Sequence, residues 1–200
     1  MSNDFFETIR CEDGNILNIS FHQERYERVL NLFGVRDAKN LLDYITPPKY
    51  GLIRCRLVYK IYKDYHTIEI AYHEYKKREI GSLKLIYCDD IDYELKSLDR
   101  GKIDELYAKR GGYSDILIVK NSFITDTSIA NIAFFDSDRW VTPANPLLKG
   151  TTRERLLREK KIFEDNIRVH DLDRFSNVAL MNAMIDFDII AKKAKDFCAG

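Results

Sequence analysis

The chain has 200 residues, of which 45% are hydrophobic and 32% are charged, and its 32 basic residues are balanced by 32 acidic ones. This composition is typical of a folded protein, and a formal net charge of zero removes the general electrostatic reason to expect a nucleic-acid partner. No apolar run approaches the roughly 20 residues that cross a bilayer, and the start of the chain lacks a signal-peptide pattern. We therefore expect a cytoplasmic protein with no membrane partner.

Four cysteines are spread along the chain and form no CxxC pair. Neither a zinc site nor a redox motif is indicated, so we predict no metal site and expect reduced, mostly buried thiols.

The N-terminal part predicts a small α+β domain that ends near residue 90. Its first element is a hairpin over 5–10 and 16–19, because Asp13-Gly14 tolerates the positive φ of a tight turn. Apolar residues at helical spacing predict a helix over 22–33, followed by a short helix over 37–44. Runs rich in Ile, Val, Leu and Tyr predict strands over 52–62, 66–75 and 82–87.

The remaining residues, 91–200, predict a second domain built around an antiparallel or barrel-like sheet. A helix over 97–109 is closed by Gly111-Gly112, and a second helix is predicted over 151–160. The predicted strands cover 115–120, 123–126, 130–135 and 140–142. Short elements follow around 166–170 and 177–184, and the tail over 192–195 reads as a solvated helix end.

Three places combine polar side chains with exposed backbone. In 146–153, Gly150-Thr151-Thr152 precede a helix, which suits either a phosphate site or a simple N-cap. In 124–134 a strand breaks into polar residues, which suits either an acid aimed at a ligand or a turn that satisfies its own backbone. Arg25 at the start of the first helix presents a planar fork to a phosphate or is simply exposed to solvent.

The order of these pieces along the chain carries further information. It reads Phe6-Glu7-Thr8-Ile9-Arg10, His22-x-x-Arg25, ITDTSIANIAF over 124–134, Trp140-x-Thr142-Pro143, PLLKGTTR over 146–153, and Asn182-Ala183-Met184. In this order the pieces resemble the class IV aminotransferase family, which contains branched-chain and D-amino-acid aminotransferases and 4-amino-4-deoxychorismate lyase. The resemblance implies a pyridoxal 5′-phosphate (PLP) enzyme that acts on a small-molecule amino substrate and forms a homodimer.

The same resemblance implies the two-domain α+β architecture of fold type IV. Residues 1–90 would form the small N-terminal domain, and residues 91–200 the PLP-binding pseudo-barrel domain. Lys96 matches the place of the family's Schiff-base lysine, upstream of strand 115–120, with Lys84 and Lys102 as alternatives. Such a lysine must be partly desolvated, because burial lowers its pKa and frees the amine to act as a nucleophile.

Asp126 falls where the family has a glutamate that pairs with the pyridine nitrogen of PLP. A carboxylate there keeps that nitrogen protonated, so the ring accepts electron density when a C–H bond of the substrate breaks. Aspartate is shorter by one methylene, about 1.5 Å, so the resemblance implies a deeper ring or a bridging water. The phosphate-binding groups implied by the family are Arg25, the amides of Thr151 and Thr152 and the Thr152 hydroxyl. Ser128 and Asn131 would brace the loop that carries Asp126.

One departure from the family lies just after the lysine, where relatives carry a tyrosine that touches the phenolic oxygen of PLP. Arg100 and Gly101 stand there instead, so Arg100 or another residue would replace that contact. The Asn182-Ala183-Met184 segment resembles the lyases more than the branched-chain aminotransferases. It therefore favours formation of 4-aminobenzoate, a folate precursor, and pyruvate. The alternatives are aminotransfer on branched-chain or D-amino acids, and a non-catalytic PLP-binding protein.

Overall fold

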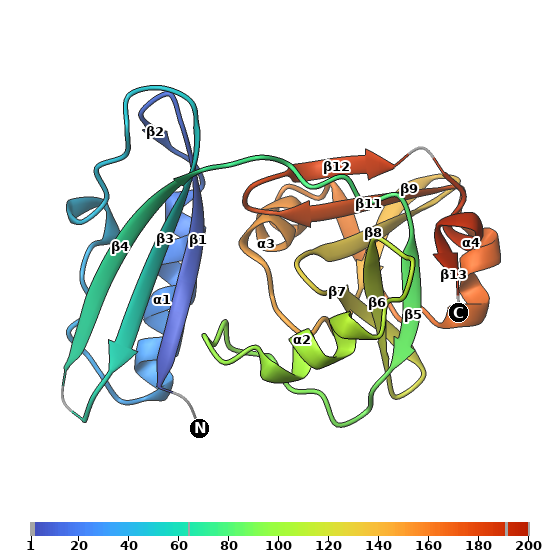
Figure 1. Ribbon diagram of the computed structural model, residues 1–200, viewed down its shortest axis with the longest axis horizontal. Coiled ribbons are helices and arrows are strands. Elements are labelled where there is room, and N and C mark those ends of the chain that lie inside the picture. The colour runs from blue at the N-terminus through green and yellow to red at the C-terminus, as the bar shows by residue number, and fades with distance from the viewer. Residues whose placement is uncertain (1–2, 64, 191, 200) are drawn as a thin grey trace. The chain divides into compact units, whose positions relative to one another are not determined.

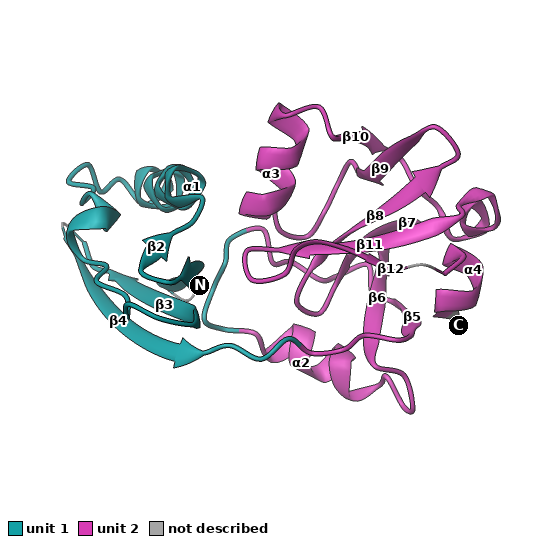
Figure 2. Cartoon of the chain, turned by 90° about the horizontal axis from the view of Figure 1, so that it is seen from above, with its two compact units in different colours: residues 1–77, 95–99 teal, residues 78–94, 100–200 magenta. Residues whose placement is uncertain are grey.

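The structure is a computed structural model that describes residues 3–63, 65–190 and 192–199. It divides into two compact units (Figure 2). Unit 1 comprises the chain up to Lys77 together with Leu95–Asp99, and unit 2 comprises Arg78–Glu94 and the chain from Arg100 onward. The predicted division lay between residues 90 and 91. In the structure the chain leaves unit 1 earlier and returns to it briefly, and the cofactor-binding role of residues 91–200 stays a prediction.

Unit 1 is a four-stranded antiparallel sheet with a helix against one face (Figure 1). The strand order is β2 (Asn15–Ile16), β1 (Asp4–Glu12), β3 (Leu52–Ile61), β4 (His66–Glu74), and the helix is α1 (Ile19–Leu32). The predicted hairpin is confirmed, with Asp13 and Gly14 at φ values of 48° and 79° in its turn. The predicted helix and the strands near 52–62 and 66–75 are confirmed too.

The core of unit 1 lies between the sheet and α1, and it follows from the alternation of the strands. Buried residues of β1 and β3, such as Ile9 and Leu57, pack against Tyr26 and Leu30 of α1. The predicted helix over 37–44 is wrong, because only the single 3₁₀ turn η1 (Leu41–Asp43) forms. So short a segment gains too few hydrogen bonds to offset helix nucleation, and it buries only Leu41 of that turn.

Residues 95–99 belong to unit 1 because they pair with the free edge of β1. The amide of Phe6 donates to the carbonyl of Lys96 at 3.0 Å, and the amide of Leu98 donates to the carbonyl of Asp4 at 2.9 Å. Ser97 forms an antiparallel bridge with Phe5. The helix predicted over 97–109 therefore begins later than expected, as α2 (Gly101–Ala108), since the preceding residues are held in extended form.

Unit 2 is built on a mixed nine-stranded sheet. Its main path runs in the order β10 (Ile162–Asp165), β9 (Arg139–Pro143), β8 (Asn131–Asp136), β7 (Phe123–Thr127), β6 (Asp115–Lys120), β5 (Leu83–Tyr87), β13 (Cys198–Ala199). Strand β11 (Asn177–Asn182) pairs with β8 and with β12 (Asp186–Ile190). The helices are α2, α3 (Thr151–Arg158), α4 (Ala194–Phe197) and the 3₁₀ segment η2 (Val169–Arg174).

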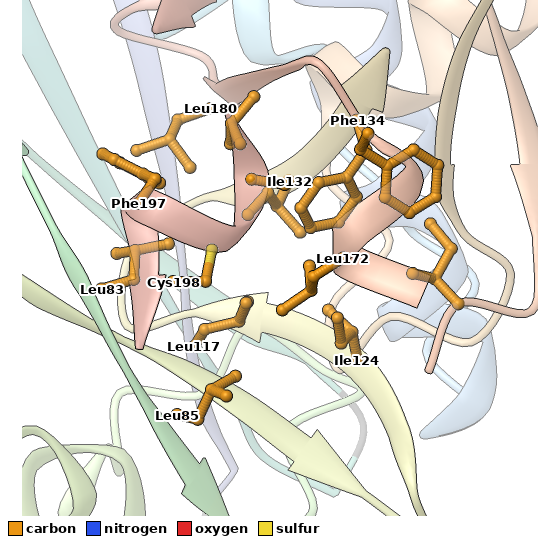
Figure 3. Packing of buried hydrophobic residues seen from close by; sticks show 14 of the residues in the cluster. Leu83, Leu85, Leu117, Ile124, Ile132, Phe134, Leu172, Leu180, Phe197 and Cys198 are labelled. Carbon is orange, nitrogen blue, oxygen red and sulfur yellow. The ribbon is translucent and has the colours of Figure 1, made fainter. Parts of the chain in front are cut away.

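The core of unit 2 gathers on the inner side of these strands, where Leu117, Ile132, Phe134 and Leu180 meet (Figure 3). Lys192, Lys193 and Lys195 are exposed, in agreement with the solvated helix end predicted over 192–195. Ala194 and, beyond that range, Phe197 of α4 pack into the same core. The aromatic ring of Phe197 gains free energy when its apolar area is buried. The next residue, Cys198, begins β13 and pairs with Leu83 of the parallel strand β5. The four cysteines are free and buried, as predicted. In the described part of the chain no helix has both the length and the apolar character needed to span a membrane.

Candidate active site

Unit 1 holds a buried ionic cluster between β1 and α1. The Glu7 side chain is fully buried and accepts two hydrogen bonds from the guanidinium of Arg25. Nε donates to Oε1 at 2.8 Å, and Nη2 donates to Oε2. His22 Nδ1 lies 2.6 Å from the same Oε2. The guanidinium therefore meets the carboxylate as a planar two-point fork, which fixes its direction.

The protonation states of this cluster follow from its contacts. Burial alone would raise the pKa of Glu7, but the charge of Arg25 and the hydrogen bonds from His22 and Arg25 outweigh it and lower the pKa to about 2. Burial lowers the pKa of His22, against the opposing effect of Glu7. At neutral pH Glu7 is ionised and His22 is neutral. Because an ionised carboxylate only accepts hydrogen bonds, His22 donates through Nδ1.

Lys96 lies at the same edge of β1, beside Phe6. Its Nζ is 4.7 Å from the centre of the Phe6 ring, and the Arg56 guanidinium is 4.9 Å from the same ring. Both contacts are cation–π interactions. Its two rivals lie in unit 2 with structural partners, since Lys84 Nζ donates to the Lys109 carbonyl at 3.1 Å and Lys102 Nζ pairs with Asp90 at 3.1 Å.

Asp126 in β7 is a second buried carboxylate, and its partners are neutral. Asn131 Nδ2 donates to Oδ1 at 2.7 Å, and the amide of Leu148 donates to Oδ2 at 2.9 Å. Burial raises the pKa of Asp126 to about 6, although these hydrogen bonds and the charge of Arg153 act in the opposite direction. A carboxyl with this pKa exchanges a proton near neutral pH.

Asn131 links Asp126 to the loop before α3. Its Nδ2 also donates to the Leu148 carbonyl at 2.8 Å, so one amide braces both the acid and the loop. Gly150 follows in that loop, and a Cβ at this position would lie 2.1 Å from Asn131 Oδ1. Only glycine fits so close an approach.

Thr151 and Thr152 open α3 immediately after Gly150, and both are buried. Gly150 is the N-cap and offers no side-chain hydrogen bond to the first turn. The start of α3 therefore combines two buried threonines with the positive end of a helix dipole, an arrangement suited to an anion.

The turn between β7 and β8 is held by two distant side chains. Arg100 Nη2 donates to the Ser128 carbonyl at 2.9 Å, and Asn182 Nδ2 donates to the Ile129 carbonyl at 3.2 Å. Arg100, at the place of the family's tyrosine, also lies 5.6 Å from the centre of the Tyr93 ring. Asn182, which belongs to the segment that favours a lyase in the sequence, thus has a structural role in this turn.

The structure distributes the predicted site residues over both units. Lys96 and Arg25 lie in unit 1, whereas unit 2 holds Asp126, Ser128, Asn131, Thr151 and Thr152. Within unit 2, Asp126 and Asn131 are in direct contact. Sequence reasoning missed Glu7 as the partner of Arg25, and His22 as the second partner of Glu7. A signal was present, because Glu7 interrupts the inward-facing apolar series Phe5, Ile9 and Cys11, and a charge in such a position needs a buried partner.

A family model for class IV aminotransferases matches residues 92–191, half of the chain. An uncharacterized protein of Haemophilus influenzae is 41% identical over 185 residues, which cover 90% of this chain and 96% of the relative. The crystal structure of a candidate 4-amino-4-deoxychorismate lyase from Haemophilus somnus is 34% identical. The match has a TM-score of 0.81 and covers 92% of this chain and 97% of that one.

The architecture recurs in the branched-chain amino acid aminotransferase of Escherichia coli, with a TM-score of 0.75 at 14% identity. That match covers 96% of this chain and 76% of the aminotransferase, and it concerns the fold alone. The mixed sheets and few helices described above agree with the predicted α+β architecture of fold type IV. The chain therefore belongs to the class IV aminotransferase family, whose members are PLP-dependent enzymes.

Proposed function

We propose that the protein is a PLP-dependent 4-amino-4-deoxychorismate lyase, which forms 4-aminobenzoate and pyruvate. Both products carry a carboxylate, so the substrate carries two. The observation that carries the proposal is a row of cations on the face of the unit 1 sheet that points away from α1. The folate-pathway role and the homodimer implied by the family, and the cytoplasmic location expected from the sequence, are parts of the same proposal.

The cationic row begins with a cross-strand pair of arginines. Arg10 of β1 lies directly opposite Arg54 of β3, and Arg54 lies opposite His73 of β4. Like charges in directly opposite positions destabilise a sheet. Glu12 offsets Arg10 at 2.7 Å, but Arg54 Nε is buried and has no hydrogen-bond partner in the described part of the chain. A carboxylate of the substrate would satisfy that donor and relieve the repulsion.

The chemistry of the described residues fits PLP. A phosphate is bound by a guanidinium or by a helix start. Unit 1 offers the guanidinium of Arg25, whose Nε and Nη2 hold Glu7, and unit 2 offers the Thr151-Thr152 turn of α3. A pyridine nitrogen needs a buried carboxyl, which Asp126 offers. Its two oxygens have about four acceptor sites, and its three donors, Asn131 Nδ2 and the amides of Leu148 and Leu147, leave room for a fourth. When bound, PLP supplies an electron sink for the bond that breaks next to the amine.

Each residue has a distinct task in this proposal. Lys96 would hold PLP through its Nζ and then move the proton next to the substrate amine. Asp126 would hold the proton at the ring nitrogen, while Asn131 fixes the direction of its carboxylate. Ser128 and Asn131 would brace the loop, and Arg100 would meet the phenolic oxygen that relatives contact with tyrosine.

Turnover with a single substrate tests the reaction. A lyase releases pyruvate repeatedly from 4-amino-4-deoxychorismate without a keto acid, because its reaction needs no second substrate. An aminotransferase would stop after one equivalent and resume on addition of 2-oxoglutarate or pyruvate. A visible spectrum that responds to no amine would instead identify a non-catalytic PLP-binding protein.

An Arg54→Gln variant tests the cationic row. We expect kcat/KM to fall about tenfold to a hundredfold, mainly through KM, because one charge-assisted hydrogen bond to the substrate is lost. Lys60→Gln is the matched control, since Lys60 is a cation on the same face of β3 and pairs with Glu69 at 3.8 Å. Equal effects in both variants would mean that only the general charge of the face matters.

A further inference from the structure

Glu7 has no task in the function proposed above, yet it is a fully buried carboxylate beside two residues that do. Its neighbour Phe6 contacts Lys96 on one side of β1, and its own side chain contacts Arg25 on the other. The amide of Phe6 also donates to the Lys96 carbonyl. Residues 6 and 7 of β1 therefore touch both the lysine and the arginine of unit 1.

The side chains of the cluster carry charges that cancel. Ionised Glu7 and Arg25 cancel, and His22 is neutral, so the three side chains together carry no net charge. The cluster therefore offers a phosphate little long-range attraction. What Glu7 adds is direction, because Nε and one Nη of Arg25 are both fixed on the carboxylate.

Burial makes this fixing effective. Arg25 is 7% exposed and Glu7 is 0% exposed, so no water shell competes for the fork. His22 donates to Glu7 Oε2 from the same helix as Arg25, three residues earlier, and so holds the carboxylate from a second direction. Neither the carboxylate nor the guanidinium can rotate without breaking a buried hydrogen bond.

We propose that Glu7 is a positioning residue that aims the Arg25 guanidinium at the phosphate of PLP. The proposal rests on the phosphate-binding role given to Arg25 in the proposed function. The alternative role predicts the opposite effect on phosphate binding. If Glu7 acted only as a counter-charge, its removal would leave Arg25 uncompensated and would strengthen phosphate binding. Removal of a positioning residue must weaken phosphate binding.

The test compares two ligands that differ only in the phosphate. PLP and pyridoxal both react with the lysine, but only PLP can use Arg25. Dissociation constants of both are measured by absorbance for the full chain and for Glu7→Gln. We expect the PLP constant to rise about tenfold, the scale of one charge-assisted hydrogen bond, with less than about a twofold change for pyridoxal. An unchanged ratio of the two constants, or tighter binding of PLP, overturns the proposal.

Two controls separate this proposal from its neighbours. Asp115→Asn also removes a buried carboxylate from an arginine, since Asp115 pairs with Arg78 at 2.6 Å in unit 2, and it should leave the ratio unchanged. Arg25→Lys keeps the charge but loses the fork. If Arg25→Lys leaves the ratio unchanged, the proposed phosphate site is wrong; if it alters the ratio and Glu7→Gln does not, only the role of Glu7 is wrong.

A further variant covers the case in which Glu7→Gln does not fold. Glu7→Asp keeps the negative charge but withdraws the carboxylate by about 1.5 Å, which breaks the two-point contact. We expect the ratio to shift in the same direction as for glutamine, by a smaller factor. A ratio equal to that of the unchanged protein would again contradict positioning.

Discussion

Glu7 in unit 1 and Asp126 in unit 2 are both almost completely withdrawn from water, yet their pKa values move in opposite directions. Glu7 faces a guanidinium and has a pKa of about 2, whereas Asp126 faces amides and has a pKa of about 6. Burial sets the size of the electrostatic effect, and the charge of the partner decides its sign. One carboxylate is therefore a fixed anion, and the other can exchange a proton.

This difference matches two tasks in the proposed PLP site. A residue that positions a phosphate-binding arginine, as proposed for Glu7, must keep one charge state throughout a reaction. A group that faces a ring nitrogen, as proposed for Asp126, must share a proton with it.

The largest effect is expected from Lys96→Ala, because Lys96 is the proposed nucleophile and lies in unit 1 with Glu7. Turnover should fall at least about a thousandfold, since neither the anchored cofactor nor the proton carrier remains. In the unchanged protein, borohydride reduction followed by peptide mapping should find the cofactor on Lys96. A label on Lys84 or Lys102 would contradict the assignment.

Asp126→Asn should reduce turnover by about a hundredfold or more while PLP stays bound, because the phosphate contacts survive and the proton at the ring nitrogen is lost. The new amide must also turn one N–H toward the Leu148 amide or Asn131 Nδ2, both of which are donors. Steady-state kinetics with cofactor content checked by absorbance measures this. Asp136→Asn at the far end of β8 is the control, and near-normal turnover in Asp126→Asn would reduce Asp126 to a turn residue.

The pH dependence of stability should show the opposite signs directly. The pKa of Asp126 is raised from 3.8 to about 6, so its stabilising contribution is complete below pH 3.8 and is lost as the pH rises through 6. The pKa of Glu7 is lowered from 4.5 to about 2, so its contribution is complete above pH 4.5 and is lost as the pH falls through 2. Each is worth up to about 3 kcal/mol.

Urea unfolding between pH 2 and pH 8 measures both contributions. We expect Asp126→Asn to flatten the decline between about pH 4 and 6, and Glu7→Gln to flatten the decline on the acid side. A variant that shifts the whole curve without changing its slope would show that its carboxyl titrates equally in the folded and unfolded states.

Lys96, Asp126 and the Thr151-Thr152 pair were chosen from short stretches of sequence that resemble the family, and their roles stay predictions. Contacts between elements that are distant in the sequence are harder to predict. The partner of Arg25 did not emerge, because Glu7 and Arg25 are 18 residues apart on different elements. The sheet places one opposite the other only after β1 and α1 have packed.

Element boundaries failed where tertiary pairing overrode helix propensity. Residues 97–99 have helical neighbours, yet they pair with the edge of β1 and delay the start of α2. In the tail of the chain, Lys192, Lys193 and Lys195 are exposed as expected, whereas Phe197 is buried. Strands β10, β12 and β13 were not predicted, and the last of these has only two residues. Their formation depends on an existing neighbouring strand more than on their own residues.

The smallest of the expected effects concerns the amides that surround Asp126. Gly150→Ala would place a methyl group 2.1 Å from Asn131 Oδ1, and Asn131 cannot retreat without losing its hydrogen bonds to Asp126 and the Leu148 carbonyl. We expect the free energy of unfolding to fall by about 1–3 kcal/mol. Gly112→Ala is the matched control, because nothing lies within 4 Å of a Cβ at that position.

If Gly150→Ala acts through Asn131, it should also raise the pKa of Asp126 further, since a hydrogen bond that favours its charged form is weakened. The decline in stability with rising pH should then extend to higher pH than in the unchanged protein. Loss of stability with an unaltered pH profile would mean that the loop moves and Asn131 stays in place. The hydrogen bond from Asn131 to Asp126 would then not depend on the close approach of Gly150.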